Sequence, residues 1–408
     1  MVNQRLDLLT DYPFQRLRDL LGDAPAGGAE KGRGPNAGAI SMALGEPQNG
    51  APDLLMQALS GAAADFGRYP AVNGTPGLRA AIAAWLNRRY GLSGAAAIDP
   101  EREVIPLNGT REGLFALAQL VVPGDRRHGP RPLVLTPNPF YQCYLGAATM
   151  AGADIHLMPA TRDSGFLPDL EALTPETLDR AALIYLCTPG NPQGAIADVD
   201  YLNKALALCR AHGIVLALDE CYAEIYNDAP PPGGLQVAAS TGERYRGLVV
   251  FHSLSKRSSA PGLRSGFMAG DADLVARFAK LRSFGGAPLP GPVAAASEAL
   301  WRDEAHVEAN RAYYRDLFDI ADEELGNLAG YRRPAGGFFL WLEVGDGADF
   351  AYRAWTQAGV RVLPGGYLAR DDAQGNNPGA PYVRVALVQD PDTTRTALRR
   401  LAGLMAAS

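Results

Sequence analysis

Short apolar runs recur along the chain between about residues 103 and 270, and stretches with helical spacing separate most of them. The runs lie at 103–107, 132–136, 154–158, 182–186, 214–218, 248–252 and 266–270. Continuous apolar strands joined by helices are what a mostly parallel sheet, covered on both faces, requires. The pattern therefore predicts an α/β fold built on a seven-stranded sheet.

The last interval between these runs is shorter than the others. Only about a dozen residues, with Pro261 and Gly262 among them, link 248–252 to 266–270, and a crossover helix hardly fits in that length. We therefore predict that strand 266–270 runs antiparallel to its neighbours, while the rest of the sheet is mostly parallel.

The pattern changes after residue 290. A long helical stretch, an alternating set of three strands and a terminal helix follow, at 307–326, 336–344, 359–364, 382–388 and 393–406. This order predicts a smaller α+β domain. We expect a large domain at 51–290, a small domain at 291–408, and a segment at 1–50 that packs with the small domain.

The composition argues against a nucleic-acid-binding protein, a membrane protein and a secreted protein. The chain has 408 residues, 47% of them hydrophobic, and a formal charge of −6, which gives no sign of a nucleic-acid or membrane partner. The start lacks a signal-peptide core, no apolar run is long enough to span a bilayer, and the four cysteines form no C-x-x-C pair. We expect a cytoplasmic protein with no metal site, packing cysteines and a flexible connector at 22–38.

The residues directly after the strands carry the candidate chemistry, because ligands of an open α/β sheet bind beyond the carboxyl ends of its parallel strands. Asn108, Gly109, Thr110 and Arg111 follow the first run and open a helical stretch. Glycine allows close backbone approach, and the free N–H groups of a helix start can hold an anion such as phosphate. A plain helix cap by Asn108 or Thr110 is the alternative.

Polar residues also follow the later strands. Tyr141 lies in a proline-stiffened turn and can present a flat surface to an aromatic ring, and Asn191 can offer an amide to a ligand. Asp219 ends a buried strand, where a carboxylate needs a cation such as a protonated pyridine nitrogen, and Tyr222 follows it. The alternatives are ordinary loop packing for Tyr141, a common Asn-Pro turn for Asn191 and a cap of the next turn for Asp219.

The stretch HSLSKRSSAPGLRSGF at 252–267 decides between these alternatives. Ser253, Ser255 and Arg264 can complete a phosphate cup, and Lys256 can form an imine with an aldehyde. A basic surface loop explains this stretch alone. Together with the other strand ends, however, it supplies a phosphate cup, a pyridine partner, a stacking ring and an imine-forming lysine, a set that chance explains poorly.

These motifs resemble those of the class I/II aminotransferases, which are fold-type I enzymes that depend on pyridoxal phosphate. The resemblance extends from about Gly45 to the end of the small domain. It implies that Lys256 carries the cofactor and that Arg264, Ser253 and Ser255 contact its phosphate.

Other motifs of the family imply the rest of the site. The implied roles are Asp219 on the pyridine nitrogen; Asn191 and Tyr222 on the ring oxygen; Tyr141 as the stacking ring; Gly109, Thr110 and Arg111 at the phosphate; and Gly45, Asn191 and Arg384 at the substrate. Lys256, Asp219 and Tyr222 are the implied catalytic residues. Tyr69 resembles a tyrosine that reaches the phosphate of a second subunit, which implies a homodimer with shared active sites.

Several blocks, including YPFQRLRDLL, ALGEP and PNPFYQCY, are similar to proteobacterial succinyldiaminopimelate aminotransferases of lysine biosynthesis. This similarity implies exchange of an amino group between glutamate/2-oxoglutarate and N-succinyl-2-amino-6-oxopimelate/N-succinyl-LL-diaminopimelate. Both substrates carry a distal carboxylate, so a second cationic group is expected, and Arg68, Arg282 and Arg361 are candidates.

Three other functions share the cofactor residues. An aspartate- or alanine-type aminotransferase would differ only in its substrates. A β-eliminating lyase would release pyruvate and ammonia from amino acids such as cystathionine. A cofactor-binding regulator is disfavoured, because the sequence carries no appended DNA-binding module.

Overall fold

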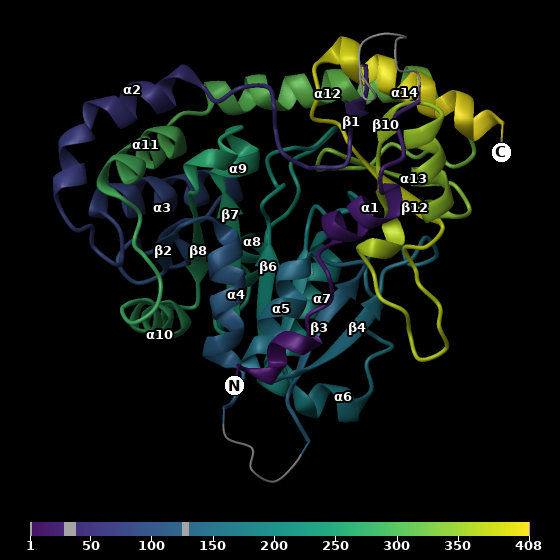
Figure 1. The fold of residues 1–408 in the computed structure, drawn as a ribbon. Coiled ribbons are helices and arrows are strands. Elements are labelled where there is room, and N and C mark those ends of the chain that lie inside the picture. Colours follow the sequence, from purple (N-terminus) through teal and green to yellow (C-terminus); the bar gives the residue numbers. More distant parts are fainter. Residues whose placement is uncertain (1, 28–37, 125–129, 408) are drawn as a thin grey trace.

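The computed structural model describes residues 2–27, 38–124 and 130–407 (Figure 1). Seven strands form the main sheet in the order β2-β8-β7-β6-β5-β3-β4. Their bounds are β2 Val104–Leu107, β3 Leu133–Asn138, β4 Asp154–Pro159, β5 Ala181–Cys187, β6 Val215–Asp219, β7 Leu248–Ser253 and β8 Gly266–Gly270. Each strand corresponds to one apolar run of the sequence, so the prediction of a seven-stranded sheet is confirmed.

The strand directions decide which loops meet. β3 is parallel to β4 and β5, and β6 is parallel to β5 and β7, whereas β8 is antiparallel to both β2 and β7. The link from β7 to β8 holds only α9 (Leu254–Arg257) and η4 (Pro261–Leu263), which confirms the predicted antiparallel strand. The carboxyl ends of β2, β3, β5, β6 and β7 therefore lie at one edge of the sheet, together with the start of β8.

Helices cover both faces of this sheet. They are α2 Asp53–Gly61, α3 Pro76–Tyr90, α4 Thr110–Val121, α5 Gln142–Ala151, α6 Pro175–Arg180, α7 Val199–His212, α8 Gly234–Ala239, α10 Ala272–Arg282 and α11 Gly291–Arg302. Alternate strand residues face opposite sides. Thus Ile184 and Leu216 pack with α3, α7, α8 and α11, while Tyr185 and Phe251 pack with α4, α5 and α10. This alternation explains why the strands are apolar throughout.

Cap residues set where the helices begin and end. Thr75 caps α3, because its hydroxyl accepts a hydrogen bond from the Leu78 N–H at 3.2 Å, and Gly91 ends the helix in the left-handed conformation at φ 64°. Asp198 and Gly213 do the same for α7. After α7, only Gly213 and Ile214 come before β6 begins at Val215.

A second, smaller sheet has the order β11-β12-β9 and packs with the helices around it. The elements are α12 Ala305–Leu325, β9 Phe339–Glu343, α13 Gly347–Thr356, β10 Val360–Arg361, β11 Leu363–Pro364, η5 Gly365–Tyr367, β12 Tyr382–Ala386 and α14 Pro391–Ala406. The apolar run at 359–364 thus forms two short strands rather than one. α12 runs along one side of the molecule from α11 to α14 (Figure 1).

The N-terminal segment supplies the partner of β10. Its elements are η1 Gln4–Leu8, α1 Pro13–Leu21 and β1 Ile40–Ser41. Two further short helices, η2 Ala63–Gly67 and η3 Gly94–Ala96, lie later in the chain. β1 pairs in parallel with β10, and α1 packs against α13 and β11, whereas η1 contacts α5. The domain boundaries at residues 50 and 290 stay a prediction. Of the connector predicted at 22–38, residues 28–37 lie outside the described residues.

Among the helices of the described ranges, none combines the length and the apolar character that a membrane span needs. A cytoplasmic location stays a prediction.

Candidate active site

A cavity of about 220 Å³ opens at the sheet edge where the strand ends meet. Its lining includes twelve of the residues predicted from the sequence: Gly45, Thr110, Arg111, Tyr141, Asn191, Asp219, Tyr222, Ser253, Ser255, Lys256, Arg264 and Arg384. These residues span the chain from the N-terminal segment to β12. The fold therefore brings nearly the whole predicted set to one place.

Lys256 lies on the four-residue helix α9, directly after β7. Its Nζ donates a hydrogen bond to the carbonyl oxygen of Gly45 at 2.7 Å and lies 5.0 Å from the centroid of the Phe338 ring. Burial, with smaller contributions from Arg384 and Arg264, lowers the pKa of Lys256 from 10.5 to about 8. The amine is therefore partly neutral near physiological pH, as a nucleophile or a base must be.

Asp219 lies at the end of β6 and is 5% exposed. Its Oδ2 accepts a hydrogen bond from the Tyr144 hydroxyl at 2.7 Å, and its Oδ1 accepts one from the Cys221 N–H at 3.3 Å. Burial raises the pKa of this carboxyl, and these hydrogen bonds act in the opposite direction. A bound cation would stabilise the ionised form further, so the site suits a protonated ring nitrogen.

The start of α4 and the β7–β8 link form a cradle for an anion. Gly109 has φ 81°, and a Cβ at this position would lie 2.3 Å from Nη2 of Arg264. Glycine adopts this left-handed φ without strain and leaves room for the Arg264 guanidinium beside the start of α4. Ser253 and Ser255 line the same wall, and the positive end of the twelve-residue helix adds to the attraction for phosphate.

Arg384 of β12 also lines the cavity and is 5% exposed. It donates to Oδ1 of Asn191 at 3.2 Å and to the carbonyl oxygen of Ala43 at 2.8 Å, while its Nε is buried without a hydrogen-bond partner among the described residues. Burial lowers the pKa of Arg384 from 12.5 to about 10, which still leaves the guanidinium charged at neutral pH. A buried cation with spare donors is a natural anchor for a carboxylate.

Sequence reasoning missed two tyrosines: Tyr12 lines the cavity, whereas Tyr144 does not line it and contributes through Asp219. Tyr144 binds Asp219, and Tyr12 accepts a hydrogen bond from Arg111 at 3.4 Å, while Arg111 also donates to the Tyr141 hydroxyl at 2.6 Å. Tyr12 and Tyr144 lie outside the family motifs, in blocks that support the subgroup similarity. Nothing in their spacing indicates a place at or beside the site.

The ring of Phe339 packs so closely on Gly45 that it leaves no room for a side chain at position 45. A Cβ at Gly45 would lie 2.4 Å from Cζ of Phe339, whose ring also carries the Arg384 guanidinium at 4.3 Å. A side chain at position 45 would displace this ring, so glycine at this position keeps in place the ring against which the Arg384 guanidinium packs.

Several predicted residues lie outside the cavity. Tyr69 is fully exposed after η2, so its reach to a second subunit stays a prediction. Arg282 is 2% exposed and binds Glu112 and the carbonyl oxygen of Pro106, which leaves it unable to meet a substrate. Arg68 is exposed and lies outside the cavity. Arg361 lines a neighbouring groove, and Phe14 and Leu44 line both this groove and the cavity. None of the three arginines expected to meet a distal carboxylate therefore lines the cavity itself.

The four cysteines are free thiols, but they are not all packing residues. Cys209 is buried in the core, whereas Cys187 and Cys221 line the cavity. Cys221 lies 3.2 Å from the Thr110 hydroxyl, and burial raises the pKa of both cavity thiols well above 9. They therefore stay protonated and serve as polar wall atoms.

The lowered pKa of Lys256 leads to a direct prediction. In cofactor-free protein, the rate at which an amine-selective reagent labels Lys256 should rise with pH through a midpoint of about 8, because the neutral amine is the reactive form. Mass spectrometry of the Lys256 peptide measures this rate, and the peptide of the exposed Lys280 is the internal control. A midpoint near the ordinary 10.5 would show that burial does not act on this amine as described.

Comparison with known proteins adds independent information. The family model for aminotransferase class I and II matches residues 38–401. The LL-diaminopimelate aminotransferase of Desulforudis audaxviator is 33% identical over 98% of this chain and 97% of its own length. An aminotransferase of Neisseria meningitidis Z2491 superposes with a TM-score of 0.91 at 39% identity, covering 99% of this chain and 100% of its own. The probable N-succinyldiaminopimelate aminotransferase of Thermus thermophilus has a TM-score of 0.80 at 27% identity, covering 96% of this chain and 99% of its own.

Proposed function

Because the chain belongs to the class I and II aminotransferases, a family that depends on pyridoxal phosphate, we propose that it transfers an amino group in the diaminopimelate branch of lysine biosynthesis. Glutamate would donate the amino group to N-succinyl-2-amino-6-oxopimelate, giving 2-oxoglutarate and N-succinyl-LL-diaminopimelate. The observation that carries the aminotransfer chemistry is the cavity itself. Of the lysines that the structure describes, Lys256 alone lines it, and the buried Arg384 lines it too.

The donor set of the cavity fits pyridoxal phosphate. The cradle between Gly109 and Arg264 suits the phosphate, and the buried Asp219 suits the ring nitrogen. Asn191 and Tyr222 would bind the ring oxygen, and Tyr141 would lie against the ring. When bound, the cofactor supplies an electron sink for the bond that breaks at the substrate Cα.

Lys256 would act twice in this site. As a neutral amine it can hold the cofactor covalently, and once an incoming amino group displaces it, its Nζ can take the proton from Cα as a general base and return it as a general acid. A pKa of about 8 suits both roles, because the group then exchanges protons readily near neutral pH.

Arg384 would orient the substrate. Its guanidinium can bind the α-carboxylate in the bidentate manner, which fixes the Cα–H bond relative to Lys256. Asn191 already contacts Arg384 at 3.2 Å, so the amide holds the guanidinium in place before substrate arrives. This preorganisation reduces the entropy lost on binding.

The choice of amino acid substrate rests on relatives rather than on geometry. The Thermus thermophilus protein is named for the succinylated substrate, whereas the Desulforudis audaxviator protein is named for LL-diaminopimelate. The latter name makes unsuccinylated LL-diaminopimelate the second candidate substrate. Both compounds have a distal group, and none of the residues that line the cavity around Lys256 is assigned to bind it.

A single-turnover absorbance scan separates these candidates. Cofactor-loaded protein would be mixed separately with glutamate, N-succinyl-LL-diaminopimelate, LL-diaminopimelate, aspartate, alanine and cystathionine. We expect loss of the yellow cofactor band with glutamate and N-succinyl-LL-diaminopimelate only, because each amino donor that fits the site converts the cofactor to its amino form.

The other outcomes would each correct the proposal. Conversion by LL-diaminopimelate without its succinylated form would replace the substrate, and conversion by aspartate or alanine would move the enzyme to another pathway. Release of pyruvate and ammonia from cystathionine, without any 2-oxo acid, would identify a β-eliminating lyase. Protein that binds no pyridoxal phosphate would remove the basis of the proposal.

We also propose a homodimer with shared active sites. The support is the full exposure of Tyr69, a large aromatic side chain that would otherwise remain in water. In such a dimer, Tyr69 of each subunit would complete the phosphate site of the other.

A further inference from the structure

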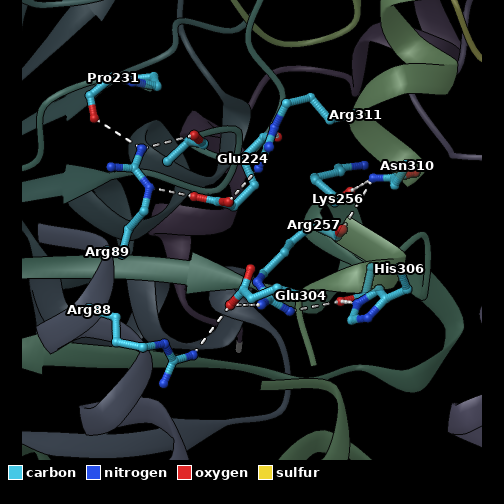
Figure 2. A network of polar contacts seen from close by, with 12 residues as sticks. Arg88, Arg89, Glu224, Pro231, Lys256, Arg257, Glu304, His306, Asn310 and Arg311 are labelled. Atoms are coloured by element: carbon cyan, nitrogen blue, oxygen red, sulfur yellow. Dashed lines mark hydrogen bonds and ion pairs between the residues drawn. The ribbon is translucent and has the colours of Figure 1, made fainter. Parts of the chain in front are cut away.

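The short helix that carries Lys256 depends on a residue from a distant helix. α9 has four residues, so its last carbonyl groups have no partner within the helix. Asn310 of α12 supplies one: its Nδ2 donates to the carbonyl oxygens of Lys256 at 3.0 Å and Arg257 at 3.1 Å (Figure 2). Asn310 is only 7% exposed, so its amide is largely shielded from bulk solvent.

The other end of the Asn310 amide ties Lys256 to the N-terminal segment. Oδ1 of Asn310 accepts a hydrogen bond from Nδ2 of Asn49 at 2.8 Å, and the Asn49 side chain also bonds to the Ser259 hydroxyl. Four residues before Asn49, the carbonyl oxygen of Gly45 accepts the bond from Nζ of Lys256 at 2.7 Å. The segment 45–49 therefore holds Lys256 at its amine directly and at its backbone through Asn310.

The neighbouring residue fixes α9 in a different way. Arg257 is 2% exposed, and its guanidinium donates to the carbonyl oxygen of Leu300 at 2.8 Å. It also binds a carboxylate oxygen of Glu304 at 2.9 Å (Figure 2). It also lies 4.8 Å from the Trp301 ring. These contacts anchor α9 to α11 and to the start of α12 through Arg257, whereas the Asn310 amide reaches the backbone of Lys256 itself.

We propose that Asn310 is a positioning residue for Lys256: by binding the last carbonyls of α9 and the Asn49 amide together, it sets where the Lys256 amine lies relative to the cavity. The proposal rests on the role of Lys256 given under the proposed function. Asn310 does not line the active-site cavity, so it would act through Lys256 and not on the substrate.

Two substitutions remove the donated bonds. Asn310→Asp keeps the shape but replaces the donor with a carboxylate facing two carbonyl oxygens, and Asn310→Ala removes the amide. We expect either change to lower kcat by about 10- to 100-fold, because a small misplacement of a catalytic group has an effect of this size. The KM for the amino donor should stay within about threefold, since uniform substrate binding is untouched.

Three further variants separate positioning from lost stability. Asn310→Gln keeps the donor, and the adjoining cavity of about 620 Å³, which Asn310 also lines, has room for the extra methylene, so it should recover most of kcat. Asn49→Ala removes the bridge between Asn310 and segment 45–49, together with the bond to Ser259, but leaves the two bonds from Asn310 to α9, so it should have a smaller effect than Asn310→Ala. Asn227→Ala removes similar bonds to the carbonyl of Pro334 and to Arg333, neither of which lines the active-site cavity, and should lower thermal stability without lowering kcat.

A second readout does not depend on turnover. In full-length protein without cofactor, the pH midpoint for labelling of Lys256 should rise in Asn310→Ala and Asn310→Asp, because an amine freed from Gly45 reaches more solvent. An unchanged midpoint together with kcat within about twofold of the parent would overturn the proposal, as would an equal loss of kcat in Asn227→Ala. A shifted midpoint in a protein that proves to act on another substrate would leave this proposal standing while the proposed function failed.

Discussion

Replacement of Lys256 by alanine should lower the rate of transamination by about 10⁴-fold or more, the largest effect expected from any single substitution. The change removes both the covalent attachment point and the only lysine amine that lines the cavity within the described chain. The phosphate cradle around Arg264 and the Asp219 carboxylate remain, so the variant should still bind pyridoxal phosphate noncovalently. Steady-state rates with glutamate and a 2-oxo acid, together with the absorbance of the bound cofactor, check both parts.

Lys280→Ala is the matched control for this experiment. Lys280 lies on the exposed side of α10, so its loss removes one charge without touching the cavity. Residual transamination by Lys256→Ala within about a hundredfold of the parent would show that another group performs the proton transfer.

Replacement of Arg384 by alanine should lower kcat/KM by about 10²- to 10³-fold, because loss of one partner of a buried, hydrogen-bonded charge pair costs about 2–5 kcal/mol. Without the guanidinium, the α-carboxylate loses the buried arginine that would bind it in the cavity. Arg384→Lys should recover only part of the loss, since an ammonium is a point charge and cannot form the bidentate pair. Initial rates over a range of amino donor concentrations measure both variants.

A substrate without an α-carboxylate provides the critical control. With a simple primary amine as donor, the parent and Arg384→Ala should be equally slow, because the interaction that the variant lacks is absent from both. A loss of equal size for amine and amino acid would mean that Arg384 acts on the fold or the cofactor and not on the carboxylate. Arg277→Ala, on the exposed face of α10, controls for the loss of a surface guanidinium.

Much of the candidate site follows from local sequence signals. Lys256, Asp219 and Asn191 each lie at or soon after the end of a buried strand, and the carboxyl ends of such strands must meet at one edge of the sheet. Gly109 could be predicted because a glycine at a helix start allows close approach to an anion, and the structure adds that the Arg264 guanidinium lies against this glycine. These signals work because strand period and turn chemistry are properties of a few adjacent residues.

Contacts between distant segments could not be predicted in this way. Tyr144 bonds to Asp219 across 75 positions, and Asn310 bonds to Lys256 across 54. Arg384 reaches the Ala43 carbonyl across 341. No spacing rule encodes such pairs, because they depend on how helices and loops pack after the sheet has formed.

The sequence by itself determined the seven strands, the antiparallel direction of β8 and the edge at which the chemistry gathers, since apolar period and link length are local quantities. The tertiary structure alone decided the strand order, the split of 359–364 into β10 and β11, and the removal of Arg282 from the substrate candidates. It also decided that Lys256 lies against Gly45 with a lowered pKa. Burial and long-range hydrogen bonding set these features, and both exist only once segments far apart in the chain have packed together.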